Sequence, residues 1–230
     1  MKVISFSLWG DNPTYTIGAV KNADLAVKLF PDWTCVYYCF PSVPKEILDS
    51  LNSRPNVLTR MVEGEYNTED CRGMFNRFLP AGEDGVEYMM VRDTDSRLSE
   101  RERLAVDEWI SSDRDIHVMR DHPYHGAPML GGMWGVKGNK LRGIADAIKD
   151  FNPTSIKGQD QAFLWEWVWG KVASGELMVC VHDPFFQKTP FPEGSKRGTD
   201  NGGVWFVGQI FDEHDVYNSQ SDLDMVKDNQ

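Results

Sequence analysis

The chain has 230 residues, enough for one full hydrophobic core at the upper end of single-domain size. Apolar residues make up 41% of it and charged residues 26%, which is ordinary for a globular protein. The net charge of -11 argues against nucleic-acid and anionic-membrane partners, because both need a basic face. An anionic substrate would therefore need a local positive site or a metal ion.

Strand-like and helix-like segments alternate along the chain. Residues 2–8 are a near-continuous apolar run, as expected for a strand covered on both faces. Ser99 and Glu102 fit a capping box that starts a helix. The expected strands are residues 2–8, 34–40, 57–62, 87–91, 116–119, 133–137 and 177–181. The expected helices are residues 15–30, a short one from Pro44, 69–79, one from Ser99, 141–151 and 160–169.

This order of elements predicts an α/β fold with a mainly parallel, Rossmann-like central sheet flanked by helices. No internal repeat or linker-like stretch occurs, so we expect one domain over residues 1–212. Residues 213–230 are polar and acidic, and we expect them to form a tail that frays. In such a sheet the ligand lies at the carboxyl ends of the strands.

Targeting signals and cysteines give little further information. No run of 18 apolar residues occurs, so no transmembrane segment is expected, and residues 3–8 are too short for a signal-peptide core. The cytoplasm is therefore the expected compartment. Cys35 and Cys39 lie in one expected strand and are interpreted as buried thiols rather than a metal pair or a disulfide.

Asp93-Thr94-Asp95 follows the apolar run 88–91 after a single residue, Arg92. At the end of a strand the chain turns, so both carboxylates can reach one cation. Hard oxygen ligands suit Mg²⁺ or Mn²⁺, which share their coordination with substrate phosphates. A solvated acidic turn is the alternative interpretation. The preceding strand favours the metal site.

His182 follows another apolar run, residues 178–181, and could supply a third ligand. A half-buried histidine bonded to the backbone is the alternative. His122 and His125 flank a loop and are weaker candidates.

Asp160 stands at the start of an aromatic-rich helix, where it could cap the helix or hold a sugar hydroxyl. Gly131-Gly132 offers bare backbone that a ligand could approach closely, or is simply a turn. The sequence has neither a dinucleotide-binding glycine motif after its first strand nor a P-loop, which disfavours both of those enzyme classes.

Six segments in this order carry a resemblance to a known family: KVISFSLWG, CRGMFNRFLP, VRDTDSRLSERE, MRDHPYHGAPMLGGMWG, GQDQAFL and VHDPF. Over residues 2–210 the chain resembles single-domain GT-A fold glycosyltransferases. The group it is most similar to contains the galactosyltransferase and glycogenin-like enzymes and similar virus-encoded transferases.

The resemblance implies a role for each matching position. It implies an Mn²⁺ (or Mg²⁺) site made by Asp93, Asp95 and His182. It implies Asp160 and Gln161 near the reacting sugar carbon. The implied contacts with the nucleotide and donor sugar are Phe6, Ser7, Leu8, Arg72, Arg77, Asp93, Thr94, Gly131 and Gly132.

One segment departs from the family. Related enzymes grip the diphosphate with a Gly-x-x-Lys-Pro-like stretch after the histidine, whereas this chain has HDPFFQKTPFP followed by GSKRGTDNGG. The candidates for binding the diphosphate in this chain are Lys188, Lys196 and Arg197. Residues 191–203 are the candidate lid, with hinges at Gly194, Gly198, Gly202 and Gly203.

These observations predict a metal-dependent glycosyltransferase of the hexosyltransferase type. It would move a sugar from a nucleotide-diphosphate sugar, expected to be a UDP-sugar, to a glycan or other acceptor. A divalent ion would offset the charge of the diphosphate. Two alternatives stay open: an aspartyl-type phosphatase or phosphotransferase, which has Thr or Val where this chain has Arg97, and a nucleotide-sugar-binding module without turnover.

Overall fold

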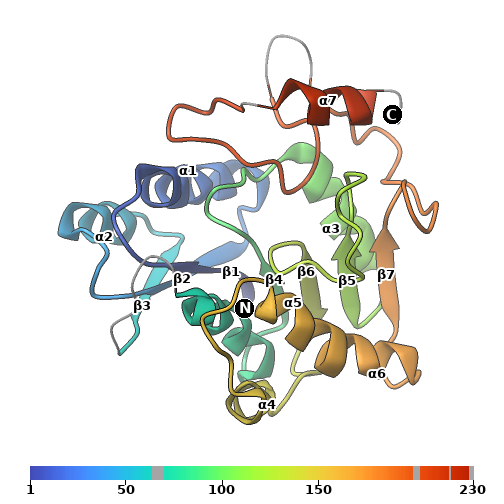
Figure 1. The fold of residues 1–230 in the computed structure, drawn as a ribbon, viewed down its shortest axis with the longest axis horizontal. Helices are drawn as coiled ribbons and strands as arrows, with labels where there is room; N and C mark the ends of the chain where they lie inside the picture. The colour runs from blue at the N-terminus through green and yellow to red at the C-terminus, as the bar shows by residue number, and fades with distance from the viewer. Residues whose placement is uncertain (64–69, 199–202, 218, 228–230) are drawn as a thin grey trace.

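A seven-stranded sheet runs through the centre of the described residues in the order β3-β2-β1-β4-β6-β5-β7 (Figure 1). The structure is a computed structural model that describes residues 1–63, 70–198, 203–217 and 219–227. The strands are β1 (Lys2–Leu8), β2 (Trp33–Cys39), β3 (Val57–Met61), β4 (Tyr88–Val91), β5 (Ile116–Met119), β6 (Trp134–Lys137) and β7 (Val179–His182).

Most neighbouring strands in this sheet are parallel. Only β6 runs against its neighbours β4 and β5 among the described strands. The register aligns Val91 with Trp134, Trp134 with Val118, and Val118 with Val181. The carboxyl ends of β1, β4, β5 and β7 therefore share one edge of the sheet. The predicted fold class, a single α/β domain with a mainly parallel central sheet, is confirmed.

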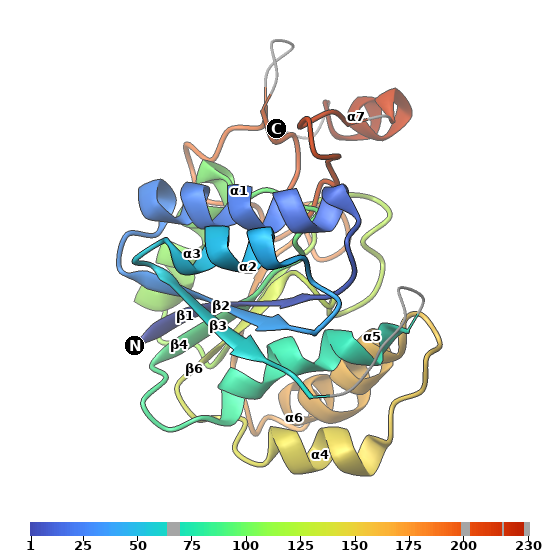
Figure 2. The same ribbon diagram turned by 90° about the vertical axis from the view of Figure 1, so that its left-hand side faces the viewer.

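Helices cover both faces of the sheet (Figure 2). One layer holds α1 (Pro13–Leu29), α2 (Lys45–Asn52) and α3 (Glu100–Ser111). The other holds the 3-10 helix η1 (Cys71–Gly82), α4 (Ile144–Phe151), α5 (Gln159–Phe163), the π-helical η2 (Leu164–Trp169) and α6 (Gly170–Ala173). The predicted capping box starts α3, where the Ser99 side chain accepts from the Glu102 amide at 3.2 Å.

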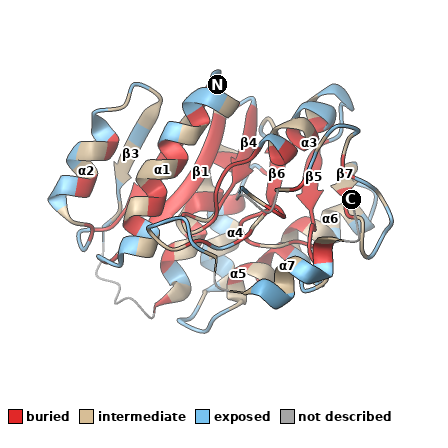
Figure 3. Cartoon of the chain, turned by 90° about the horizontal axis from the view of Figure 1, so that it is seen from above, coloured by how far each residue is buried: buried red, intermediate tan, exposed pale blue. Residues whose placement is uncertain are grey.

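Each helical layer encloses its own apolar core against the sheet. Ala23, Leu51 and Trp109 pack with Ile4 and Met90 on the α1 side. A second cluster, on the η1 side, consists of residues such as Phe75, Phe78, Met89, Trp134, Ile144 and Phe163. Figure 3 shows the central strands buried between the layers and β3 only partly buried at the edge. Because alternate residues of each strand serve opposite cores, the strands read as continuous apolar runs.

The expected helix over residues 69–79 differs in form. It is a 3-10 helix that begins at Cys71, and Glu69 lies outside the described residues. Asp70 caps it by accepting from the Arg72 amide at 3.0 Å. Pro80 stands inside its last turn, where it has no N–H to donate to an α-helical bond.

The prediction that the tail after residue 212 frays is wrong for its described part. Residues Gln220–Lys227 form α7. Val226 is fully buried in an apolar cluster with Trp205 and Phe206. Apolar residues spaced through an otherwise acidic segment therefore dock it onto the domain. Among the described residues, no helix combines the length and the apolar character needed to cross a bilayer.

Candidate functional site

Arg77 joins two acidic residues at the carboxyl edge of the sheet. Its Nη1 donates to Asp93, which follows β4, and its Nη2 donates to Asp160 Oδ2 at 3.1 Å, at the start of α5. The arginine side chain is 5% exposed and that of Asp160 4%, whereas that of Asp93 is 43% exposed. The arrangement therefore consists of a buried ion pair, Arg77 with Asp160, and one carboxylate, that of Asp93, which is open to solvent.

The backbone of Gly131 and Gly132 passes against the carboxylates of Asp160 and Asp93. A Cβ built on Gly131 would lie 2.1 Å from Asp160 Oδ2, and one on Gly132 would lie 2.0 Å from Asp93 Oδ2. A side chain at either position would have to displace one of these carboxylates, so the bare backbone itself forms one wall of the site. The structure thus brings together five of the predicted site residues: Arg77, Asp93, Gly131, Gly132 and Asp160.

Asp95 lies beside this group, and its surroundings penalise its charge. Burial, and next the nearby Asp93 carboxylate, raise the pKa of Asp95 to about 6, although Arg77 and Arg97 oppose the shift. Burial, and next Asp95 and Asp93, also raise the pKa of Tyr15. Two carboxylates that repel each other in a partly buried place are the donor set that a small divalent cation stabilises.

Tyr15 is a member of this site that the sequence interpretation missed. It stands in the first turn of α1, and α1 begins at the carboxyl edge of the sheet, directly after β1. The sequence interpretation assigned Tyr15 only to a helix. The signal that could have identified it as a site residue is its position just after the turn that joins the end of β1 to α1.

The end of β1 contributes mainly through one hydroxyl and its backbone. Ser7 Oγ accepts from the Arg77 amide at 3.1 Å and so holds η1 against the strand. Phe6 and Leu8 point into the other core, where Phe6 stacks on Tyr37. A nucleotide at this edge would therefore meet the backbone of Phe6 and Leu8 and not their side chains. Thr94 is buried between the two aspartates.

Other predicted donor contacts lie at the margin or elsewhere. Arg72 makes a bidentate ion pair with Asp70, the residue that caps its own helix, and Nη2 lies 2.5 Å from Oδ2. Gln161 is half-buried next to Asp160. Arg197 is buried and bonded to Asp121 and to the Trp205 carbonyl, so it serves the core of the candidate lid.

The other candidates for gripping the diphosphate, Lys188 and Lys196, are exposed. The predicted hinges of the candidate lid are glycines. Gly194 and Gly203 have φ of 84° and 104°, which favours glycine at both, while Gly202 lies outside the described residues.

His182 is not brought to the aspartate pair. It ends β7, three strands from β4 in the sheet order, which corresponds to roughly 14 Å at ~4.8 Å per strand. Asn22 of α1 donates to the carbonyls of Thr94 and Ser96, at 3.3 and 2.8 Å, and so draws the turn after β4 away from β7. The ring of His182 instead contacts His117, Phe191 and Glu108. The structure therefore does not assemble the expected three-residue metal set.

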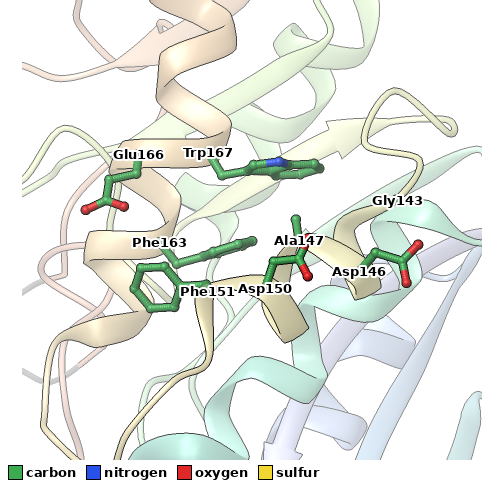
Figure 4. A pocket seen from close by; sticks show the side chains of 8 residues that line it. All are labelled: Gly143, Asp146, Ala147, Asp150, Phe151, Phe163, Glu166 and Trp167. Atoms are coloured by element: carbon green, nitrogen blue, oxygen red, sulfur yellow. The ribbon is translucent and has the colours of Figure 1, made fainter.

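A separate hollow of about 460 Å³ lies between α4 and η2 (Figure 4). Aromatic rings of Phe163 and Trp167 line it, together with the carboxylates of Asp146, Asp150 and Glu166. It shares no residue with the Arg77 group. Three carboxylates and no cation along its lining disfavour an anionic ligand there, so a diphosphate is not expected in this hollow.

Comparisons with known proteins give similarity of fold. No protein-family model matches the sequence. No curated protein matches it either. The structure is similar to a glycosyltransferase involved in the glycosylation of the major capsid of PBCV-1, with a TM-score of 0.49 and 18% identity over 80% of this chain and 81% of that one.

Two further solved structures are similar at the same level. One is the galactosyltransferase LgtC in complex with donor and acceptor sugar analogs, with a TM-score of 0.47 and 14% identity over 80% of this chain and 74% of that one. The other is 4-diphosphocytidyl-2C-methyl-D-erythritol synthase from Anaerococcus prevotii, with a TM-score of 0.48 and 12% identity over 83% and 91%. Two of these three proteins are described as glycosyltransferases. The similarity to all three structures is one of backbone fold.

Proposed function

We propose that this chain is a metal-dependent glycosyltransferase that moves a sugar from a nucleotide-diphosphate sugar, a UDP-sugar, to a glycan or other acceptor. One observation carries the proposal. Arg77 bridges the open carboxylate of Asp93 and the buried carboxylate of Asp160 beneath the bare backbone of Gly131 and Gly132. The diphosphate of a donor would lie on the Asp93 side, where a cation can bind. The sugar of the same donor would lie beside Asp160.

Asp93 and Asp95 fit a divalent cation on two grounds. Their oxygens are the hard donors that Mn²⁺ and Mg²⁺ prefer. The raised pKa of Asp95, caused by burial and by Asp93, means that Arg77 and Arg97 leave part of the pair's negative charge without compensating positive charge. A bound ion would supply that charge and help a diphosphate leave as the glycosidic bond breaks.

Asp160 is the proposed group beside the reacting carbon. Arg77 fixes its carboxylate from one side, and a side chain at Gly131 would displace it. A carboxylate held there favours the positive charge that develops at a sugar carbon as the leaving group departs. Gln161 follows it on α5 and is proposed to orient the sugar.

Binding of the donor tests the proposal first. Thermal unfolding would be followed with UDP, GDP, CDP and their sugars, each with and without Mn²⁺. A ligand at 100 times its Kd adds about 2.7 kcal/mol, which in a chain of this size raises Tm by roughly 5–10 °C. We expect that shift only with a uridine nucleotide and a metal ion together, followed by release of UDP from the matching sugar donor.

A matched pair of variants identifies the site. Asp95→Asn should lose the metal-dependent shift and slow turnover by roughly 1,000-fold, the effect of losing several kcal/mol of charge stabilisation. Asp84→Asn should change neither, because Asp84 is 83% exposed and pairs with Arg142 on the surface. Metal-dependent UDP binding without turnover of any donor and acceptor would leave a binding module. Hydrolysis of simple aryl phosphates would favour the phosphatase alternative.

A further inference from the structure

Three soft-donor side chains meet on one face of the sheet, far from the Arg77 group. His117 of β5 pairs in register with Cys180 of β7, and His182 follows two residues later on the same face of β7. One ligand atom from each of the three lies within 4.8 Å of the other two. His117 Nε2 and His182 Nδ1 are 2.9 Å apart.

Ordinary core packing does not account for this cluster. His117 and His182 are both essentially fully buried. Among the described residues, His117 Nδ1 has no hydrogen-bond partner, and His182 Nε2 has only a long 3.4 Å contact with Glu108 Oε1. The other two nitrogens, His117 Nε2 and His182 Nδ1, face each other and are the pair that could share one proton or one metal ion, while His182 Nε2 stays directed at Glu108.

We propose that His117, Cys180 and His182 form a site for a single Zn²⁺ ion. Two imidazole nitrogens and one thiolate are the donors that zinc prefers. With Zn–N bonds of about 2.0–2.1 Å, two tetrahedral nitrogen ligands lie about 3.3 Å apart, so the observed 2.9 Å requires a change of only a few tenths of an ångström. Cys180 is half-buried, which leaves room for water as the fourth ligand.

Protons and charges balance at this site. The Cys180 thiol releases its proton to solvent when the Zn–S bond forms. Each imidazole stays neutral and keeps one proton on the nitrogen that does not bind zinc. In His182 that nitrogen is Nε2, which faces Glu108. The thiolate and the Glu108 carboxylate together offset the two positive charges of the ion, and a carboxylate behind a zinc-bound histidine is a common orienting partner.

The site would hold the open edge of the sheet in place. β7 is the last strand in the sheet and pairs only with β5 among the described strands. The ring of Trp109, from α3, stacks on His117 with centroids 5.2 Å apart. Zinc would therefore tie β7 to β5 beneath α3, which lies beside both strands in Figure 1. Its role is structural, independent of any sugar transfer.

Metal analysis of the purified full chain tests the site. The Asp95→Asn variant is the background, so that the acidic pair contributes no metal. We expect one zinc per chain after dialysis. Cys180→Ser should weaken zinc binding at least about 100-fold, and Glu108→Gln roughly 10-fold, since an outer partner contributes less than a ligand. Cys71→Ser, which changes another half-buried thiol, should bind zinc normally.

Cobalt gives a second measurement, which is made first on the cluster without substitutions and then on the variants. Co²⁺ in the zinc site should show the strong visible bands of a tetrahedral ion and a near-ultraviolet thiolate band. The thiolate band should disappear in Cys180→Ser and persist in Cys71→Ser. Less than one zinc per chain, or an octahedral Co²⁺ spectrum without a thiolate band in the unmutated cluster, would overturn the proposal.

Discussion

β4 and β7 are parallel and end at the same edge of the sheet, yet the two ends differ in their chemistry. β4 runs into Asp93, whose carboxylate is 43% exposed, and Asp95. β7 ends in His182, which is buried with His117 beside the half-buried Cys180. One end offers hard oxygens to solvent and the other soft nitrogen and sulfur to the interior. Donor type and burial together, more than position in the sheet, determine which cation each end can hold.

Local contacts explain why the ends differ. Ser96 Oγ donates to the Asp93 carbonyl at 2.9 Å, which closes a tight turn after β4 and leaves the Asp93 carboxylate open to solvent with Asp95 partly buried beside it. After β7, Asp183 accepts from the amides of Phe185, Phe186 and Gln187, and its carboxylate pairs with Arg120 at 2.6 Å. The chain there turns over the sheet and leaves His182 beneath it.

Removing Arg77 should have the largest effect on stability. Arg77→Met leaves the Asp160 carboxylate, 4% exposed, without its partner, so we expect a loss of about 3–5 kcal/mol in the free energy of unfolding in urea. Adding Asp160→Asn should recover part of that loss, because the uncompensated charge is gone. Arg142→Met, which breaks an exposed pair, is the control and should change stability by less than about 1 kcal/mol. An equally small effect of Arg77→Met would mean that Asp160 is not held as described.

Metal removal should separate the two ends by their functions. A chelator should lower both stability and sugar transfer. Zn²⁺ added back at 100 times its Kd should restore about 2.7 kcal/mol of stability, and Mn²⁺ should restore the transfer. Thermal unfolding and UDP release, measured on the same samples, report the two outcomes. Recovery of both stability and sugar transfer with Mn²⁺ alone would contradict the assignment of two different metal ions to the two sites.

The sequence predicted the β4 end well because its signals are local. An apolar run followed one residue later by Asp93-Thr94-Asp95 indicates both the strand and the position of the acids at its end. The β7 end depends on strand order. Cys180 and His182 are two residues apart and so share a face of any strand, but nothing local shows that β7 pairs with β5 and meets His117. Grouping His182 with the aspartates therefore required a topology that a single sequence does not specify.

Gly132→Ala should disturb the β4 end without unfolding the chain. The new methyl group would lie 2.0 Å from Asp93 Oδ2, so the carboxylate must move, at a cost of about 1–3 kcal/mol. We expect weaker metal-dependent donor binding and unchanged zinc content. Gly170→Ala is the matched control, since no atom lies within 4 Å of its added carbon. Loss of zinc in Gly132→Ala would show that the two ends are coupled.

Asp215→Asn should have the smallest effect, and it measures how far the C-terminal segment supports the β4 end. Asp215 pairs with Lys21 at 2.6 Å and with Arg97 at 2.8 Å. Burial opposes its charge, but these two partners outweigh it and lower the pKa of Asp215 below 3.8. The pairs therefore stabilise the fold at neutral pH, and the contribution disappears as the pH falls through the lowered pKa. Because the side chain is 50% exposed, we expect less than about 1 kcal/mol at pH 7. Urea unfolding of the variant and the original chain at pH 7 and pH 3 checks this. A loss well above that size at pH 7 would show that Asp215 holds Arg97 beside Asp95 as part of the site, and a loss that grows in acid would contradict the ion-pair account.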